Sequence, residues 1–192
     1  TLSGLPWQIE MQADDSIKVF GLHIGVSHLS DAVAILGNDH ELAIISATSV
    51  VTGDDMGNLE MYYGHYQAGL LSGKLVLQVD SSEQSIQRWR ENAVKADYMA
   101  SGRAKKHSLS PDDLPEVLNE VIIGITFIPA VNLDEKVILE RFGMPTQMIH
   151  APEVTHYLYP EKGLDVALYA KSKEVLQYVA PVKFQQLIEP LQ

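Results

Sequence analysis

Histidine side chains are the groups in this 192-residue chain most suited to metal binding or proton transfer near neutral pH. A zinc site needs two or three such groups close together, usually with a carboxylate. His23, His28 and Asp31 form the set with the best spacing, but no HExxH or HxH pattern occurs. We therefore predict structural or solvated roles, and no metal, for all seven histidines: His23, His28, His40, His65, His107, His150 and His156.

Motifs for nucleophilic catalysis and for phosphate binding are also missing. The sequence has no cysteine, no GxSxG motif and no glycine-rich phosphate loop. Asp54, Asp55 and Glu60 lack the spacing of a calcium-binding EF-hand loop. We predict no catalytic residue and no cofactor, and hence a protein that is not an enzyme. A hydrolase that uses histidine and acidic residues is kept as a third-ranked alternative.

An aromatic group in the first half of the chain is the best local candidate for a binding site. Tyrosine suits interfaces because its ring is rigid and apolar while its hydroxyl is polar. Alternation along a strand places Tyr62 and Tyr63 on opposite faces, whereas Tyr157 and Tyr159 share one face. The candidate binding residues, with an ordinary core role as the alternative, are Tyr62, Tyr63, His65, Tyr66, Tyr157 and Tyr159.

The net charge of −11 excludes several partners. Such a charge repels nucleic-acid backbones and anionic lipid, so we predict no nucleic-acid partner. Residues 81–107 differ from the rest because they carry six basic and three acidic residues. This segment is either a solvated helix face or a docking patch for an acidic partner. No apolar run approaches the roughly 20 residues of a membrane-spanning helix.

The first half of the sequence predicts a hairpin, a helix and three strands. The hairpin covers 7–20, and the helix begins at Ser27 and ends at Gly37. Strands are expected at 42–46, 59–63 and 70–79. Ser82 is the N-cap of a helix to residue 96, residues 97–110 read as a polar connector, and another short helix begins at Ser110.

The second half repeats the order of helix and strands. An apolar strand is expected at 121–127, followed by a helix that begins at Asn132 and ends at Gly143. Four strands are expected at 147–150, 155–159, 164–170 and 175–179, and the tail from 181 docks as a short helix. Because each half has a helix, a terminating glycine, a strand and a tyrosine-containing strand, the pattern indicates an internal duplication.

The second half also resembles a known group of proteins. The segments that carry the resemblance are Arg-Phe-Gly-Met-Pro at 141–145, His-Tyr-Leu-Tyr at 156–159 and Gly-Leu-Asp-Val at 163–166. They resemble the SmpA/OmlA (BamE-like) small envelope lipoproteins and the tandem units of the β-lactamase-inhibitor-protein fold. The whole chain also resembles bacterial envelope proteins. The resemblance implies α+β units, protein binding rather than catalysis, and a location on the periplasmic side of the cell envelope.

We therefore expect an α+β protein of two similar helix-plus-antiparallel-sheet units joined by a helical connector. The expected boundaries are 1–80, 81–120 and 121–192, and the two sheets either merge or pack side by side. The expected function is that of a protein–protein interaction module. The alternative is a small-molecule or lipid-binding protein that uses a groove between the units. Because the sequence begins at Thr1 without a signal peptide, we expect the native N-terminus and any membrane anchor to lie upstream.

Overall fold

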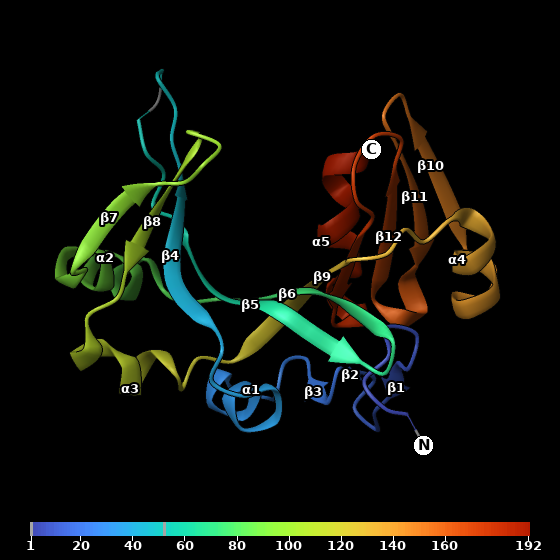
Figure 1. Ribbon diagram of the computed structural model, residues 1–192, viewed down its shortest axis with the longest axis horizontal. Helices are drawn as coiled ribbons and strands as arrows, with labels where there is room; N and C mark the ends of the chain where they lie inside the picture. The colour runs from blue at the N-terminus through green and yellow to red at the C-terminus, as the bar shows by residue number, and fades with distance from the viewer. Residues whose placement is uncertain (1, 52) are drawn as a thin grey trace.

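The computed structural model, which describes residues 2–51 and 53–192, contains five α-helices and two antiparallel sheets (Figure 1). This observation confirms the mixed α+β class. The small sheet is formed by β1 (Glu10–Met11), β2 (Ile17–Val19) and β3 (Leu22–His23). The large sheet has ten strands, in the order β10 (Gln147–Ala151), β11 (Val154–Tyr159), β12 (Leu164–Tyr169), β13 (Val175–Val179), β9 (Ile122–Pro129), β6 (Leu71–Val79), β5 (Asn58–Ala68), β4 (Glu41–Ala47), β8 (Ala104–Ser108) and β7 (Lys95–Tyr98).

Burial alternates along the strands of the large sheet and so distinguishes its two faces. In β5, Leu59, Met61 and Tyr63 are buried, whereas Glu60 and Tyr62 between them are half-buried. Successive side chains of a strand point to opposite faces, so the first set faces the core and the second faces away from it. The same reasoning applies across the neighbouring strands, because every pair in the sheet is antiparallel and in register over most of its length.

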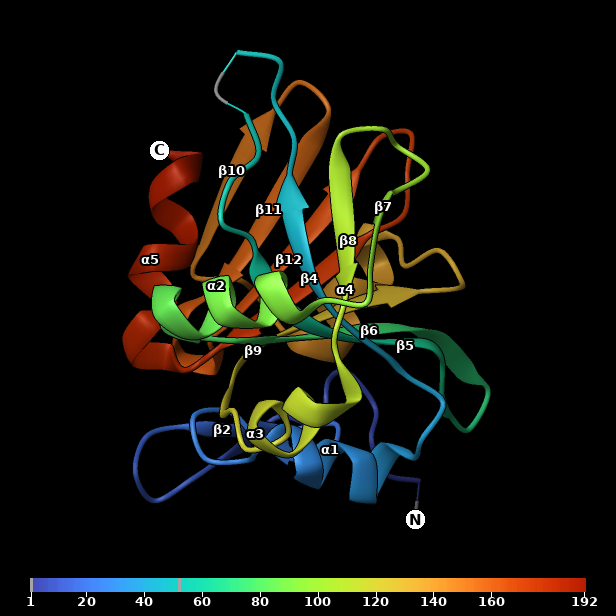
Figure 2. The ribbon, with the colours of Figure 1, turned by 90° about the vertical axis from the view of Figure 1, so that its left-hand side faces the viewer.

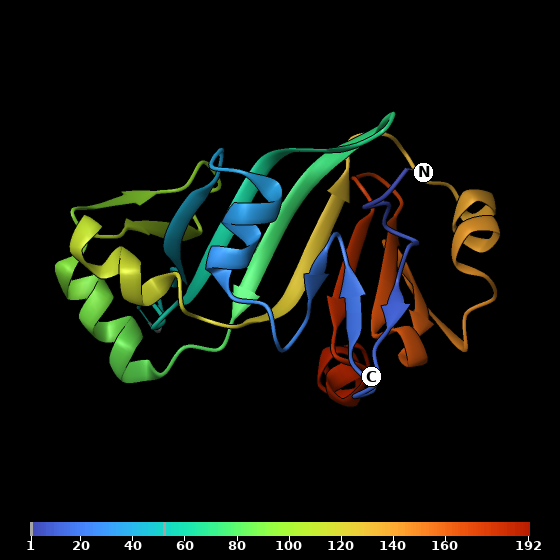
Figure 3. The same cartoon turned by 90° about the horizontal axis from the view of Figure 1, so that it is seen from below.

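One hydrophobic core lies on the buried face. Its members run along the chain from Ile17 to Tyr178 and come from the small sheet, the large sheet and four of the helices. Figure 3 shows α1 and the small sheet lying over one face of the large sheet. The helices are α1 (Leu29–Leu36), α2 (Glu83–Asn92), α3 (Leu114–Val117), α4 (Glu135–Phe142) and α5 (Phe184–Ile188). Since the core is continuous, the two expected units share one hydrophobic interior.

The large sheet is bent into two arms. Strands β4, β7 and β8 rise at one end and β10, β11 and β12 rise at the other, and Figures 1 and 2 show the two ends facing each other. The arms are joined where β6 pairs with β9, for instance at Val76 and Thr126. The two expected sheets have therefore merged into one, with an open face between the arms.

The middle segment differs from the expected helical connector. Residues 81–120 contain α2 and α3, but residues 97–110, expected to be a polar connector, overlap the antiparallel hairpin β7–β8. Strand β8 pairs with β4, for instance His107 with Ile44, so this hairpin extends the large sheet. The expectation of a polar connector at 97–110 was wrong, because edge strands with one solvated face are polar and give little apolar periodicity.

The two helices that end in glycine share an unusual contact. Gly37 and Gly143 follow α1 and α4 and have φ values of 94° and 87°, a region that favours glycine. The hydroxyl of Tyr63 donates a hydrogen bond to the carbonyl oxygen of Gly37 at 3.0 Å, and that of Tyr159 donates to Gly143 at 2.9 Å. Each hydroxyl thus satisfies a carbonyl that the helix end leaves without a partner. Burial raises the pKa of both phenols to about 12.

Removal of either hydroxyl should weaken the fold. We expect Tyr63→Phe and Tyr159→Phe each to lower the free energy of unfolding by about 1–2 kcal/mol, because a buried carbonyl loses its donor. Urea denaturation of both variants measures the loss. Tyr169→Phe is the matched control, because the Tyr169 side chain is exposed, and it should leave the midpoint unchanged. An equal midpoint for all three variants would contradict the structural role of these bonds.

Candidate functional site

A groove on the open face of the large sheet is the best candidate for a functional site. Its floor consists of side chains that point away from the core. Strand β4 contributes Glu41, Ala43 and Ile45, β5 contributes Glu60 and Tyr62, and β6 contributes Val76. These residues are neighbours across the strands, since Glu41 pairs with Tyr62 and Tyr62 pairs with Val76.

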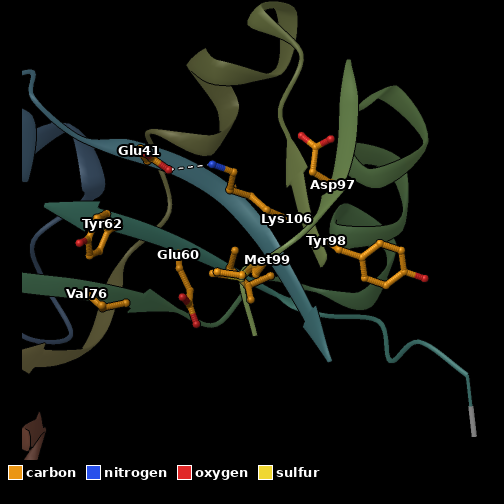
Figure 4. A pocket seen from close by; sticks show the side chains of 11 residues that line it. Glu41, Glu60, Tyr62, Val76, Asp97, Tyr98, Met99 and Lys106 are labelled. Carbon is orange, nitrogen blue, oxygen red and sulfur yellow. Dashed lines mark hydrogen bonds and ion pairs between the residues drawn. The ribbon is translucent and has the colours of Figure 1, made fainter. Parts of the chain in front are cut away.

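The hairpin β7–β8 forms the outer wall of this groove. Asp97, Tyr98, Met99 and Ala100 line it from β7 and the turn that follows, and Lys106 lines it from β8. Figure 4 shows Met99 close to Glu60, while the Tyr98 ring points to the outer side. The cavity has a volume of ≈ 610 Å³. We call this cavity the open-face groove.

The charged side chains of the groove are paired with one exception. Lys106 Nζ lies 2.9 Å from Glu41 Oε2, and Lys95 Nζ lies 2.7 Å from Asp97 Oδ2. The Glu60 carboxylate has no hydrogen bond or ion pair with any residue that the structure describes. Burial raises the pKa of the Glu60 carboxyl. The groove therefore holds one partly desolvated carboxylate whose charge is not balanced locally.

The free carboxylate should reduce stability, and the reduction should depend on pH. A raised pKa in the folded state means that the protonated form favours folding, and that this contribution is lost as the pH rises through the folded pKa. We expect Glu60→Gln to be more stable than the wild type at pH 7, by less than about 1 kcal/mol because water still reaches the groove. The difference should vanish below the unfolded-state pKa of about 4.3.

Urea midpoints at pH 7 and pH 3.5 (below about 4.3) test this expectation. Glu10→Gln is the control, because Glu10 is exposed on β1 and the substitution removes the same charge. A Glu60→Gln variant that is less stable than the wild type at pH 7 would show that Glu60 makes a stabilising contact in the native state.

Two smaller hollows continue the groove along the same face. One, of ≈ 370 Å³, is lined by Tyr62, His65 and Lys74 among others. The next, of ≈ 450 Å³, is lined by His65 and Lys74 and extends to Ile128 on β9. Tyr62 lies at the boundary between the groove and the first hollow, so it is the aromatic side chain that both share.

The other half of the open face is covered. Helix α5 places Phe184 and Ile188 against Leu158 of β11, and these three residues form a second, smaller apolar cluster. Beside it, His156 Nδ1 lies 2.9 Å from Asp165 Oδ2, and both side chains are buried. Burial raises the pKa of the Asp165 carboxyl, although the neighbouring histidine opposes this effect. The α5 helix thus closes one half of the open face and leaves the groove half uncovered.

The six aromatic candidates are divided between the core and the surface. Tyr63, Tyr157 and Tyr159 are at most 4% exposed and lie in the core, so the expectation that they contact a partner is corrected. Their strands turn them toward the helices, and Tyr157 donates a hydrogen bond to Glu135 at 3.1 Å. Tyr66 packs against the core and donates to the carbonyl of Gly4. Tyr62 lines the groove, and both Tyr62 and His65 line the first hollow beside it.

The groove also contains residues that the sequence did not single out. These residues are Val76, Met99 and Lys106, which belong to different strands or turns. They meet because the sheet has the strand order β6–β5–β4–β8–β7. The signal present in the sequence is the two-residue spacing of Glu60 and Tyr62, which places both on one face of a strand. In the sequence, Glu60 stands out only beside Asp54 and Asp55, and the spacing of these three residues does not fit a calcium loop.

His23 and His28, the two histidines with the best spacing for a metal site, have different partners. The ring of His28 lies 3.5 Å from Asp31, whereas the His23 ring lies near Asp14 and Ser16. Within residues 2–51 and 53–192, no three histidine or acidic side chains are placed to hold a metal ion. No helix in this described part of the chain is both long enough and apolar enough to cross a membrane.

Comparison with known proteins identifies no relative: the chain matches no protein-family model, no curated protein and no solved structure.

Proposed function

We propose that this protein is a protein–protein interaction module and that the open-face groove is its binding surface. The observation that carries the proposal is the uncovered half of the large sheet. Helix α5 covers the β11 part of the open face, whereas Ile45, Tyr62 and Val76 line an open groove in the other part. Apolar and aromatic side chains with a polar rim are typical of protein-binding surfaces.

The charge of the chain agrees with this proposal. A net charge of −11 disfavours nucleic acids and anionic lipid as partners and favours a partner with a basic surface. The strands of the groove floor, β4, β5 and β6, are each paired on both sides, so a partner does not have to order them on binding. The resemblance of residues 141–166 to small envelope lipoproteins supports a partner within the bacterial envelope.

The proposal includes an internal duplication of the chain. It is supported by the two matching contacts of Tyr63 with Gly37 and of Tyr159 with Gly143. In both cases a glycine ends a helix, and a tyrosine of the second strand after that helix caps it. If the chain is duplicated, α5 covers the sheet face of the second unit. The corresponding face of the first unit is the open-face groove, where we propose that the partner binds.

Site-specific photocrosslinking tests the binding surface. A benzophenone amino acid replaces Tyr62 in one variant and Tyr169 in a second, and both are exposed to solubilised envelope extract. We expect a discrete crosslinked partner from position 62 and none from position 169, which lies on the opposite arm of the sheet. Equal crosslinking from both positions, or from neither, would falsify the assignment of the groove.

A small-molecule site is the second candidate function. The groove volume of ≈ 610 Å³ lies in the range of about 300–1,000 Å³ that is typical of ligand pockets. Native mass spectrometry of the purified protein distinguishes the two functions. A bound small molecule that is lost in a Val76→Trp variant, which fills the groove, would favour the second candidate.

A further inference from the structure

We propose that the groove recognises an arginine or lysine side chain of the partner, which pairs with Glu60 and lies along Tyr62 and Met99. This inference rests on the proposed function and specifies the chemistry of the partner segment. Three features of the groove support it: an unbalanced charge, the apolar surface around that charge, and uncharged neighbours on the adjoining strands.

The unbalanced charge is that of Glu60. Four charged residues line the groove, and they are Glu41, Glu60, Asp97 and Lys106. Glu41 is paired with Lys106 at 2.9 Å, and Asp97 is paired with Lys95 at 2.7 Å. A cation that enters the groove therefore interacts most favourably with Glu60, because binding there does not require an existing ion pair to break.

The surroundings of Glu60 suit a long basic side chain rather than a small ion. Val76 and Met99 provide apolar surface beside the carboxylate, as Figure 4 shows, and the methylene groups of lysine or arginine pack well on such surface. The Tyr62 ring is two residues from Glu60 on the same face, where it offers an aromatic surface to a cation. Among the described residues, no three histidine or acidic side chains are placed to hold a metal ion.

Among the described residues no lysine or arginine is paired with Glu60, and neither of its cross-strand neighbours is basic. On β6, the residue opposite Glu60 is Gln78. Its side-chain amide donates a hydrogen bond to Thr126 Oγ1 at 3.0 Å, on the side away from Glu60. On the other side, Glu60 pairs with Ala43, which is small and apolar. Glu60 thus lines the open groove between two uncharged neighbours, where a basic side chain of a partner can reach it.

Nuclear magnetic resonance with two short peptides tests the inference. The probes are Ac-Leu-Arg-Leu-NH₂ and its neutral isostere Ac-Leu-citrulline-Leu-NH₂, each titrated to about 10 mM into ¹⁵N-labelled protein, a range that detects millimolar affinity. We expect the arginine peptide to shift the amide signals of Glu60, Tyr62, Val76 and Met99. It should bind about three to ten times more tightly than the citrulline peptide, as a partly desolvated charge pair requires.

The Glu60→Gln variant should bind both peptides equally, whereas Glu10→Gln, with the same net charge, should behave as the wild type. Equal binding of the two peptides to the wild-type groove would overturn the role of Glu60 but leave the groove as a binding surface. No shift in the groove with either peptide would overturn the inference. The proposed function is judged separately, by crosslinking from position 62.

Discussion

Phe20→Ala should lower the free energy of unfolding by about 3–5 kcal/mol, the cost of removing a large aromatic side chain from a packed core. Phe20 is 2% exposed and lies between the small and large sheets. Its ring centroid lies 5.3 Å from that of Tyr66 and 5.4 Å from those of Phe127 and Tyr178. Alanine would therefore leave a cavity where three aromatic rings converge.

The backbone of Phe20 adds to this expectation. Its φ of 55° lies in the left-handed region, which a non-glycine residue adopts only where its surroundings hold it. Alanine keeps the unfavourable φ but loses the ring contacts that compensate for it. Urea denaturation measures the loss, with Phe20→Leu expected to be less destabilising and Tyr98→Ala, at a residue 66% exposed, nearly neutral. A loss below about 1 kcal/mol would indicate that the small sheet is not part of the cooperative core.

Gly163→Ala is the second substitution for which we expect a large loss, of roughly 3 kcal/mol or more. Gly163 follows the turn after β11 and has a φ of 60°. An added Cβ would lie 1.9 Å from the carbonyl oxygen of Val179, far inside the contact distance. The backbone amide of Val179 also donates to the carbonyl of Gly163 at 2.9 Å, so the two segments cannot separate without losing that bond.

Gly102→Ala separates the steric effect from the conformational one. Gly102 has a φ of 67°, but a Cβ at this position meets no atom within 4 Å. We expect Gly102→Ala to lower the free energy of unfolding by about 1 kcal/mol, because only the left-handed backbone disfavours alanine there. Thermal or urea unfolding of both variants gives the comparison. If the two substitutions lower the free energy of unfolding equally, β13 must move away from Gly163 at little energetic cost.

Local signals in the sequence predicted most helices and strands. Ser82 caps α2 as expected, because its hydroxyl accepts a hydrogen bond from the amide of Ser85. Gly37 and Gly143 end α1 and α4 as expected. The N-caps of those two helices were placed one and two residues too early, since His28 and Asp134 occupy them. Several short polar residues precede each helix, and only the tertiary structure selects among them.

Features that depend on distant parts of the chain could not be predicted in the same way. The hairpin β7–β8 carries alternating charges such as Lys95 and Asp97, and it forms a strand pair because β4 offers an edge. Alternation showed that Tyr157 and Tyr159 share a face but not which face is buried. That choice depends on α4 and α5, which pack on opposite sides of the C-terminal arm. The groove could not be predicted for the same reason, because the strand order of the sheet is what brings Met99 and Val76 together.

The pairing of β6 with β9 has a consequence for the synthesis of the chain. Strand β6 ends at Val79, but its partner β9 begins only at Ile122, so the ribosome releases β6 well before its neighbour exists. During that interval β6 is an edge strand with unpaired amides and carbonyls, of the kind that invites pairing between chains. We expect the nascent chain to need a chaperone or rapid elongation until β9 emerges, so that the second half protects the first from aggregation.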